Sequence, residues 1–455
     1  MKVVKVRSEG LAHNSYYISS KGESAVIDPR RDAKIYLKLA KEDCAKIRYI
    51  FETHRNEDYV IGSLELQSQT NAQICHSKEL PFKYGEHKLS EDEALSLGTI
   101  KIKTLYTPGH TNESLSYVIV EENETQTVFT GDTLFAGSVG RTDLYGKQAQ
   151  KKQTEKLYNS LHEKILKLGD GVLVYPAHGS GSICGSKISG HEPTTIGYEK
   201  LTNPYLQLGK EEFILKSENE QLIVPRYFKQ IEELNLNGPP LLSNLSYPQP
   251  YRLLEFEKEM QVNNMIVIDT RLPYAFAGAH IPNSLSIWLD GISVYPGWLM
   301  DINQYILLIL ERPEDIKPVT TRFRRLGFVN IIGYLCGGMN TWQEAGKPIQ
   351  NFSTTSAAEL ANKLNKEEVR LIDVREPQEW KDDGYIEAAE LIPFFELPEK
   401  ANSIPRDKTI AVTCSVGNRS STALSILERT GFKQLINVLG GVTAWSNLHY
   451  PTKNK

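Results

Sequence analysis

An internal repeat in the C-terminal part of the chain constrains the fold more than any other feature of the sequence. Residues 267–271 read VIDTR and residues 371–375 read LIDVR, and each is followed by a Gly-Gly pair and a tryptophan, Trp342 or Trp445. Two such copies predict two structural units of roughly 100 residues each. Both copies alternate short β-branched runs with helical segments, which favours an α/β fold with parallel sheets covered by helices.

The residues before the repeat predict a third, larger domain. A segment rich in proline and glycine, residues 237–250, separates this domain from the first copy. A chain of 455 residues is long enough for several domains that each bury a core. We therefore expect three domains, at residues 1–245, 251–350 and 355–455.

The composition argues against several classes of partner. The chain has 52 Lys and Arg against 56 Asp and Glu and no basic run, so nucleic acid and an anionic membrane surface are not expected partners. No apolar stretch approaches the roughly 20 residues that span a bilayer, and the N-terminus lacks the apolar core of a signal peptide. The five scattered cysteines do not resemble a disulfide framework. We therefore expect a cytoplasmic protein with free thiols.

Polar motifs follow several strand-like runs of the first domain. These motifs are THRNEDY at 53–59, TPGHT at 107–111, TGDT at 130–133 and YPAH at 175–178. Polar residues just beyond strand ends gather at one edge of a layered α/β fold. Imidazole and carboxylate groups are the ligands that transition metals take. The histidines and carboxylates of these motifs are therefore candidate metal ligands.

The order and spacing of these motifs resemble the metallo-β-lactamase fold, a four-layer αββα sandwich with its metal site at one edge of the paired sheets. Di-zinc hydrolases of that fold have histidines where this chain has Asn56 and Tyr59. The resemblance implies that the first site keeps His54, His110 and Asp132. Two histidines with one carboxylate are typical of non-haem Fe(II) oxygenases, so we expect one Fe(II) per chain. The second site retains only Asp58, His178 and the shared Asp132. Asp58 and His178 either orient ligands or hold a weak second metal.

Within that fold, the chain most resembles the persulfide dioxygenase branch, which oxidises the terminal sulfur of a low-molecular-weight persulfide to sulfite. The motifs GRTD at 140–143 and YPAH carry this resemblance. Arg141 either holds the anionic substrate or pairs with Asp143. Cys184, which follows His178 in a run of small residues, is either a thiol near the mouth of the site or an ordinary loop cysteine.

A second chemical centre is predicted at Cys414. Residues 414–420 read CSVGNRS and lie between an apolar strand, 409–413, and a helix-like run. A thiol at a helix N-terminus meets inward-pointing N–H groups and the positive end of the helix dipole, which favour a thiolate or a persulfide anion. The pattern resembles the active loop of rhodanese sulfurtransferases. That resemblance implies catalytic roles for Cys414 and Arg419 and substrate-binding roles for Ser415, Gly417 and Ser420.

The first repeat copy has no such nucleophile. Leu310 or Glu311 falls at the position that Cys414 takes in the second copy. The first copy keeps a rhodanese-like turn, GAHIP at 278–282, so we expect it to retain the rhodanese fold without the activity.

The whole chain resembles the bacterial fusions of a persulfide dioxygenase with rhodanese domains that detoxify sulfide. The resemblance implies a small-molecule thiol persulfide, O2 and sulfite as substrates, thiosulfate as a product, and a homo-oligomeric enzyme. Glutathione, coenzyme A and cysteine are all candidate carrier thiols. Two other classes stay open: a di-zinc thioester hydrolase of the glyoxalase II type fused to a sulfurtransferase, and a non-enzymatic carrier or sensor of sulfane sulfur.

Overall fold

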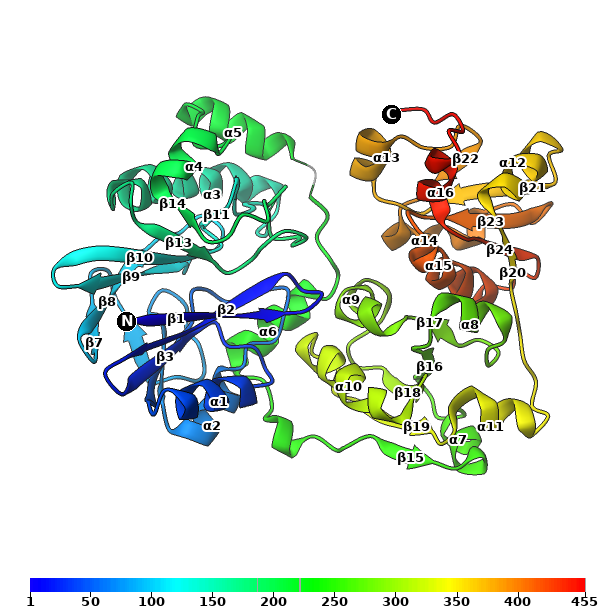
Figure 1. Ribbon diagram of the computed structural model, residues 1–455, viewed down its shortest axis with the longest axis horizontal. Helices are drawn as coiled ribbons and strands as arrows, with labels where there is room; N and C mark the ends of the chain where they lie inside the picture. The colour runs from blue at the N-terminus through cyan, green and yellow to red at the C-terminus, as the bar shows by residue number, and fades with distance from the viewer. Residues whose placement is uncertain (186, 221, 455) are drawn as a thin grey trace. The chain divides into compact units, whose positions relative to one another are not determined.

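The computed structural model describes residues 1–185, 187–220 and 222–454, and it divides into two compact units (Figure 1). The first unit comprises Met1–Leu245 and Arg324–Gly327, and the second comprises Ser246–Phe323 and Phe328–Lys455. The first unit carries the polar motifs, and the second carries both repeat copies. Among the described residues, each helix is too short or too polar to cross a membrane.

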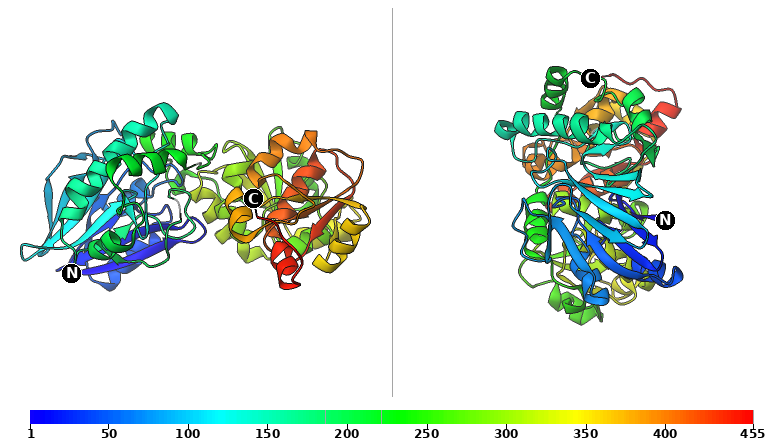
Figure 2. Two further views of the ribbon diagram at one scale, coloured as in Figure 1. Left: turned by 90° about the horizontal axis from the view of Figure 1, so that it is seen from above. Right: turned by 90° about the vertical axis from the view of Figure 1, so that its left-hand side faces the viewer.

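Two six-stranded sheets face each other in the first unit (Figure 1), and Figure 2 shows the same unit from two further directions. The first sheet has the order β1 (Lys2–Ser8), β2 (His13–Ser20), β3 (Glu23–Ile27), β4 (Lys46–Phe51), β5 (Gln73–Ser77) and β6 (His87–Leu89). The second sheet has the order β14 (Thr194–Thr195), β13 (Leu173–Pro176), β10 (Glu124–Gly131), β9 (Leu115–Glu121), β8 (Ile100–Tyr106) and β7 (Ala94–Leu97). A short hairpin, β11 (Leu134–Phe135) and β12 (Ser138–Val139), follows β10.

Helices cover the outer faces of both sheets, which confirms the predicted αββα architecture. Strand β2 shows how the sequence produces these layers, because its alternate side chains enter different cores. Tyr16 and Ile18 pack between the two sheets, whereas Tyr17 packs with Tyr36 of a covering helix. The helices of this unit are α1 (Lys34–Glu42), α2 (Ser63–Thr70), α3 (Lys147–Asn159), α4 (Ile196–Thr202), α5 (Lys210–Asn219) and α6 (Phe228–Asn237).

The second unit contains two five-stranded parallel sheets with the same strand order, as the repeat predicts. The first sheet has the order β15 (Gln249–Tyr251), β19 (Ile331–Leu335), β18 (Tyr305–Ile309), β16 (Met265–Asp269) and β17 (Leu285–Ser286). The second has the order β20 (Ser353–Thr355), β24 (Leu435–Val438), β23 (Thr409–Thr413), β21 (Val369–Asp373) and β22 (Ala389–Leu391). Val267 and Trp342 in one core match Leu371 and Trp445 in the other.

In the described part of the chain, ten α-helices complete the two copies. In the first copy they are α7 (Leu253–Glu259), α8 (Pro273–Gly278), α9 (Tyr295–Leu299), α10 (Ile316–Arg325) and α11 (Gly338–Glu344). In the second copy they are α12 (Ala357–Asn365), α13 (Pro377–Asp383), α14 (Leu397–Lys400), α15 (Asn418–Arg429) and α16 (Gly441–Asn447). Helix α15 packs on β23 and β24 of its own copy and also on α8 and β17 of the other copy.

Candidate functional sites

The polar motifs of the first unit meet because the strands before them run in the same direction. Strand β8 is antiparallel to β9, β9 is antiparallel to β10, and β10 is parallel to β13. The carboxyl ends of β8, β10 and β13 therefore lie at one edge of their sheet, and the loops that follow them carry His110, Asp132 and His178. Strand β4 of the facing sheet leads into His54.

His54, His110 and Asp132 form a compact cluster at this edge. Their donor atoms lie within 4.8 Å of one another. The Oδ2 atom of Asp132 is 3.4 Å from Nε2 of His110 and 3.9 Å from Nε2 of His54. Neither Nε2 atom makes a hydrogen bond, although both are buried. Buried nitrogen atoms without partners that converge on one carboxylate fit a metal ion, which would satisfy them together.

The other ring nitrogen of each histidine is held by the protein. The Nδ1 atom of His110 lies 2.9 Å from the carbonyl oxygen of Arg141, to which it donates, and Nδ1 of His54 lies 2.9 Å from Oγ1 of Thr53. A donor at Nδ1 leaves the Nε2 lone pair of His110 free for a metal. Gly140 makes this packing possible, because a Cβ atom there would lie 1.9 Å from the carbonyl oxygen of Asp132.

A fourth group, Glu57, reaches the same cluster and was not predicted. Its Oε1 lies 3.3 Å from Nε2 of His110, and its Oε2 lies 3.8 Å from Nε2 of His54. Burial opposes protonation of His110, but the Glu57 carboxylate raises the pKa of His110 to about 9. The signal in the sequence was a second acidic residue inside the THRNEDY motif, next to Asp58 and three residues after His54.

His178 bridges two carboxylates beside this cluster. Its Nδ1 is 2.8 Å from Oδ1 of Asp132, and its Nε2 is 2.9 Å from Oδ2 of Asp58. Although burial disfavours the imidazolium, these two carboxylates raise the pKa of His178 well above its ordinary value. Of the two open roles, this geometry fits the orienting one, because both ring nitrogens already bond carboxylates. The donor atoms of Asp58, His178 and Cys184 nevertheless also lie within 4.8 Å of one another.

The two residues that replace histidines of the di-zinc pattern have packing roles. The side-chain amide of Asn56 donates to the carbonyl oxygen of His54 at 3.3 Å. The ring of Tyr59 stacks on His13 with a centroid distance of 3.8 Å.

Arg141 is held by the protein through its whole guanidinium group. It donates to both carboxylate oxygens of Asp143, at 2.7 and 2.8 Å. It also donates to the carbonyl oxygens of Ile183, Leu222 and Ile223. The side chain is fully buried. Of the two open roles, this geometry fits the pairing with Asp143.

Cys184 lies inside the first unit, beside the metal cluster. It is fully buried, and its Sγ donates to Oε1 of Glu57 at 3.4 Å. Burial raises the pKa of this thiol well above its ordinary value, so the thiol form is favoured. Cys184 therefore lies deeper than the mouth of the site, which was one of the two positions that the sequence left open. The backbone N–H of Arg141 donates to its carbonyl oxygen at 3.0 Å.

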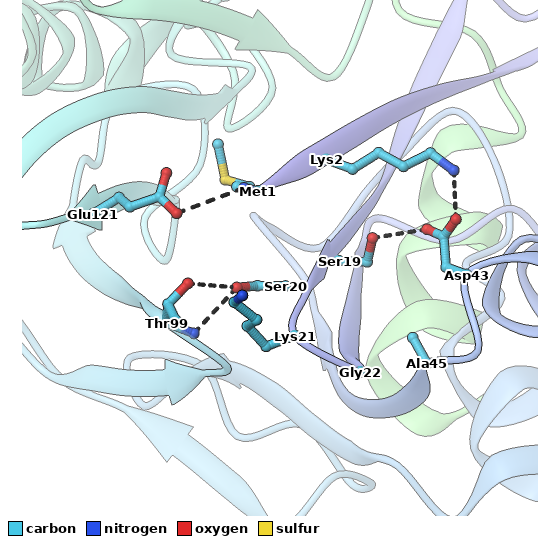
Figure 3. A pocket seen from close by; sticks show the side chains of 10 residues that line it. All are labelled: Met1, Lys2, Ser19, Ser20, Lys21, Gly22, Asp43, Ala45, Thr99 and Glu121. Atoms are coloured by element: carbon cyan, nitrogen blue, oxygen red, sulfur yellow. Dashed lines mark hydrogen bonds and ion pairs between the residues drawn. The ribbon is translucent and has the colours of Figure 1, made fainter.

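A pocket of about 370 Å³ lies at the opposite end of the first sheet and is unrelated to the metal cluster (Figure 3). Most of its polar side chains already pair with one another. The ammonium group of Lys2 and the hydroxyl of Ser19 both donate to Asp43, at 2.6 and 2.7 Å. Because these groups satisfy one another and include no metal-ligand cluster, the pocket is not a candidate active site.

The Cys414 loop in the second unit forms a cradle around a buried sulfur atom. Cys414 follows β23, and the backbone N–H of Gly417 donates to its Sγ at 3.1 Å. The Sγ also lies 3.7 Å from the hydroxyl oxygen of Ser420, which in turn donates to Oδ1 of Asn437 at 2.6 Å. Helix α15 begins at Asn418, so the sulfur lies at the positive end of a helix dipole. This arrangement can stabilise an anionic sulfur.

Arg419 beside this cradle is engaged by an acidic side chain. Its guanidinium donates to both carboxylate oxygens of Glu379 at 2.6 Å, and to the hydroxyl of Ser415 at 2.7 Å. Burial opposes ionisation of Glu379, but the Arg419 guanidinium lowers its pKa to about 2. The carboxylate therefore fixes the orientation of Arg419 and balances its charge.

The first copy contributes an aromatic side chain near this loop. Tyr295 packs edge-on against Phe394 of the second copy, with a centroid distance of 5.0 Å. Burial raises the pKa of Tyr295 to about 12, and the charges of Arg419 and Cys414 also act on it. The repeat alone did not predict that the first copy, which lacks a nucleophile, places a side chain near the Cys414 loop.

Comparisons with known proteins agree with this architecture. The sequence matches the metallo-beta-lactamase superfamily over residues 9–178 and the rhodanese-like domain over residues 253–345 and 356–448. A hydroxyacylglutathione hydrolase of Dictyostelium discoideum is 30% identical over 238 residues, which cover 46% of this chain and 86% of that protein. The mitochondrial persulfide dioxygenase of Mus musculus is 31% identical over 209 residues, which cover 45% of this chain and 74% of that protein.

A solved structure resembles a larger part of the chain. A metallo-beta-lactamase from Staphylococcus aureus is 28% identical and superposes with a TM-score of 0.65, covering 74% of this chain and 98% of that chain. Because residues 1–245 make up only a little over half of the 455 residues, the likeness reaches into the second unit.

Proposed function

Because the chain belongs to the metallo-β-lactamase superfamily and carries two rhodanese-like domains, we propose that it oxidises a low-molecular-weight persulfide and transfers sulfane sulfur to the sulfite produced. The observation that carries this proposal is the presence, in one chain, of a two-histidine, one-carboxylate cluster and of a cysteine cradle that suits a persulfide. The first centre would convert RSSH, O2 and water into RSH and sulfite. The reaction suits the reduced cytoplasm, where thiols persist.

His54, His110 and Asp132 would hold one Fe(II), which supplies open coordination positions for a substrate thiolate and for O2. The side chains around them prepare this site. The carbonyl oxygen of Arg141 fixes the tautomer of His110, and the imidazole of His178 orients Asp132. Since these side chains are buried, the site limits competition from bulk water.

Cys414 would carry the transferred sulfur. Its thiolate attacks the outer sulfur of a persulfide RSSH, so that an S–S bond forms at Cys414 and RSH leaves with the proton. Sulfite then attacks the outer sulfur of the cysteine persulfide, which releases thiosulfate and restores the Cys414 thiol. The N–H of Gly417 and the helix dipole stabilise the anionic sulfur in both steps.

A thioester hydrolase is the second candidate function, favoured by the similarity to a hydroxyacylglutathione hydrolase. Two zinc ions would need more ligands than this chain offers in the usual motif, since Asn56 and Tyr59 stand at two histidine positions. A non-enzymatic carrier of sulfane sulfur would need Cys414 but no oxygen. Both alternatives predict no O2 consumption.

Metal analysis and an oxygen electrode test the proposal. We expect about one iron per chain after reconstitution and O2 uptake with at least one of glutathione, coenzyme A and cysteine persulfides. His110→Ala should abolish O2 uptake and retain sulfur transfer from a persulfide to sulfite, whereas Cys414→Ser should retain O2 uptake and release sulfite. Two zinc ions with thioester hydrolysis, or no O2 uptake by the iron-loaded chain, would contradict the proposal.

A further inference from the structure

The carboxylate of Glu57 is placed like a metal ligand, although the resemblance to known motifs assigns it no role. We infer that Glu57 is a fourth protein ligand of the metal held by His54, His110 and Asp132. The inference rests on the proposed metal centre, but neither on the identity of the metal nor on the reaction. It changes the centre from three protein ligands to four.

The distances support this assignment. Oε1 of Glu57 lies 3.3 Å from Nε2 of His110, and Oε2 of Glu57 lies 3.8 Å from Nε2 of His54. The proposed carboxylate ligand, Asp132, lies 3.4 and 3.9 Å from the same two nitrogen atoms through its Oδ2. Ligands that bind a metal at about 2.0–2.2 Å in a tetrahedral arrangement are separated by roughly 3.3–3.6 Å. Glu57 therefore already lies where a fourth ligand would bind.

The remaining pairs complete the same arrangement. The donor atoms of Glu57 and Asp132 lie within 4.8 Å of each other, as do those of His54 and His110. Each pair among the four residues thus has close donor atoms, with Glu57 facing His110 through Oε1 and His54 through Oε2. Oε2 of Glu57 and both Nε2 atoms are buried without a hydrogen bond. One metal ion would satisfy all three atoms, which otherwise carry the cost of buried, unpaired polar groups.

The charge of the cluster also favours four ligands. Two neutral imidazoles and two carboxylates balance a divalent cation in a region where the four side chains are at most 1% exposed. With Asp132 as the only carboxylate ligand, the ion and its ligands would keep one positive charge, which is costly in a buried site. The nearby pair of His178 and Asp58 is neutral when both are ionised, so it does not change this balance.

A fourth protein ligand leaves fewer coordination positions on the metal for a substrate. A six-coordinate metal would keep two positions, enough for one monodentate thiolate and one small second ligand. A tetrahedral zinc ion would be closed and would have a structural role only. The expected substrate class is therefore a thiolate that binds through one atom, rather than a chelating substrate.

The rival explanation is that Glu57 forms only an ion pair with His110. In that case Glu57 would stabilise the metal-free protein and contribute nothing to metal binding. Glu113 provides a matched control, because it is equally buried and has an oxygen without a hydrogen bond, yet it belongs to no ligand cluster in the described residues.

Cobalt binding to the metal-free, full-length chain separates the two explanations. Co²⁺ affinity is measured by competition with a chelator, and the coordination is followed by the visible spectrum of the bound ion. We expect Glu57→Gln to weaken Co²⁺ binding at least tenfold and to change the spectrum, while Glu113→Gln leaves the spectrum unchanged. Urea unfolding of the metal-free proteins measures the contribution of the Glu57–His110 contact separately from metal binding.

Three outcomes would overturn the inference. Glu57→Gln with Co²⁺ affinity within threefold of the wild type and an unchanged spectrum would remove Glu57 from the ligand set. An unchanged spectrum together with a less stable metal-free protein would assign Glu57 to the ion pair. A wild-type chain that binds no Co²⁺, Fe²⁺ or Zn²⁺ would reject the metal centre itself. Absence of O2 uptake with normal metal binding would reject only the proposed reaction.

Discussion

At the scale of single residues, the THRNEDY motif contains one site residue that the sequence predicted, His54, and one that it did not predict, Glu57. Strand β4 ends at Phe51, three residues before His54, so the position of His54 at the sheet edge follows from the strand alone. The direction of Glu57 depends on how the loop folds after His54, and no periodic pattern encodes it. For that reason the histidine was predicted and the carboxylate was not.

Arg141 shows a similar limit. Its motif indicated a residue near the site and left two roles open, substrate binding or pairing with Asp143. The deciding contacts come from the carbonyl oxygens of Ile183, Leu222 and Ile223, far along the chain. A single sequence does not reveal which distant carbonyl groups meet a guanidinium group.

Arg141→Lys should therefore destabilise the first unit by about 2–3 kcal/mol, because an ammonium group cannot replace the five hydrogen bonds of a planar guanidinium. Urea unfolding of the metal-free chain measures this loss. Arg48→Lys is the control, since Arg48 forms a half-exposed pair with Glu23 and should change stability by less than about 0.5 kcal/mol. Unchanged stability with a higher KM for persulfide would instead assign Arg141 to substrate binding.

At the scale of elements, the Cys414 loop depends on the start of α16, which follows α15 and β24 in the chain. Gly441 has φ of 53°, and a Cβ atom there would lie 2.0 Å from the carbonyl oxygen of Cys414. The backbone N–H of Val442 donates to that carbonyl at 2.8 Å. The Gly-Gly pair that marks the repeat in the sequence is thus where the start of α16 packs against the loop that carries Cys414.

Gly441→Ala should impair sulfur transfer at least tenfold, because the added methyl group displaces the Cys414 carbonyl and with it the cradle. We also expect a stability loss of about 2–4 kcal/mol from the clash and the left-handed backbone. A rhodanese assay with thiosulfate and cyanide, together with urea unfolding, measures both effects.

Gly338→Ala is the matched control in the first copy. Its φ is 57°, and the added Cβ would lie 3.0 Å from the carbonyl oxygen of Leu310, at the loop without a nucleophile. This variant should lose stability but keep sulfur transfer within about twofold. Equal activity losses in the two variants would show that the effect acts through global stability rather than through the Cys414 loop.

At the scale of the whole chain, the repeat predicts the topology of both copies but not why the motif survives without a nucleophile. In each copy the repeated aspartate and arginine form a bidentate pair, Asp269 with Arg271 and Asp373 with Arg375. Each arginine also donates to the carbonyl oxygen of Ala279 or Gly384. The shared motif is therefore structural, and its persistence carries no information about catalysis.

The two copies are joined in the second unit by helix α15, whose residues 420–428 are all buried. Two serines of this helix, Ser421 and Ser425, contact the first copy, which the sequence alone did not predict. The hydroxyl oxygen of Ser421 lies 3.1 Å from that of Ser286, and the hydroxyl of Ser425 accepts from the backbone N–H of Ser286, also at 3.1 Å. Hydroxyl groups thus connect the helix to the edge strand β17 of the other copy.

A buried pair at the far end of the same helix connects the copies more strongly. Nε2 of His280 lies 2.9 Å from Oε2 of Glu428, and its Nδ1 lies 2.8 Å from the carbonyl oxygen of Phe276. His280→Ala would leave the Glu428 carboxylate buried without this partner, which should cost about 2–4 kcal/mol. Because Cys414 lies at the opposite end of α15, sulfur transfer at 25 °C should stay within about threefold of the wild type.

Urea unfolding, followed by tryptophan fluorescence and paired with the sulfur-transfer assay, checks this expectation. Lys400→Ala serves as the control, because the pair of Lys400 with Glu396 is largely exposed and should change stability by less than about 0.5 kcal/mol. If His280→Ala unfolds like the wild type, the pair contributes no stability and the hydroxyl contacts of α15 suffice to hold the copies together. If sulfur transfer is lost while the chain stays folded, the first copy instead has a direct part in shaping the active loop, as the contact between Tyr295 and Phe394 would allow.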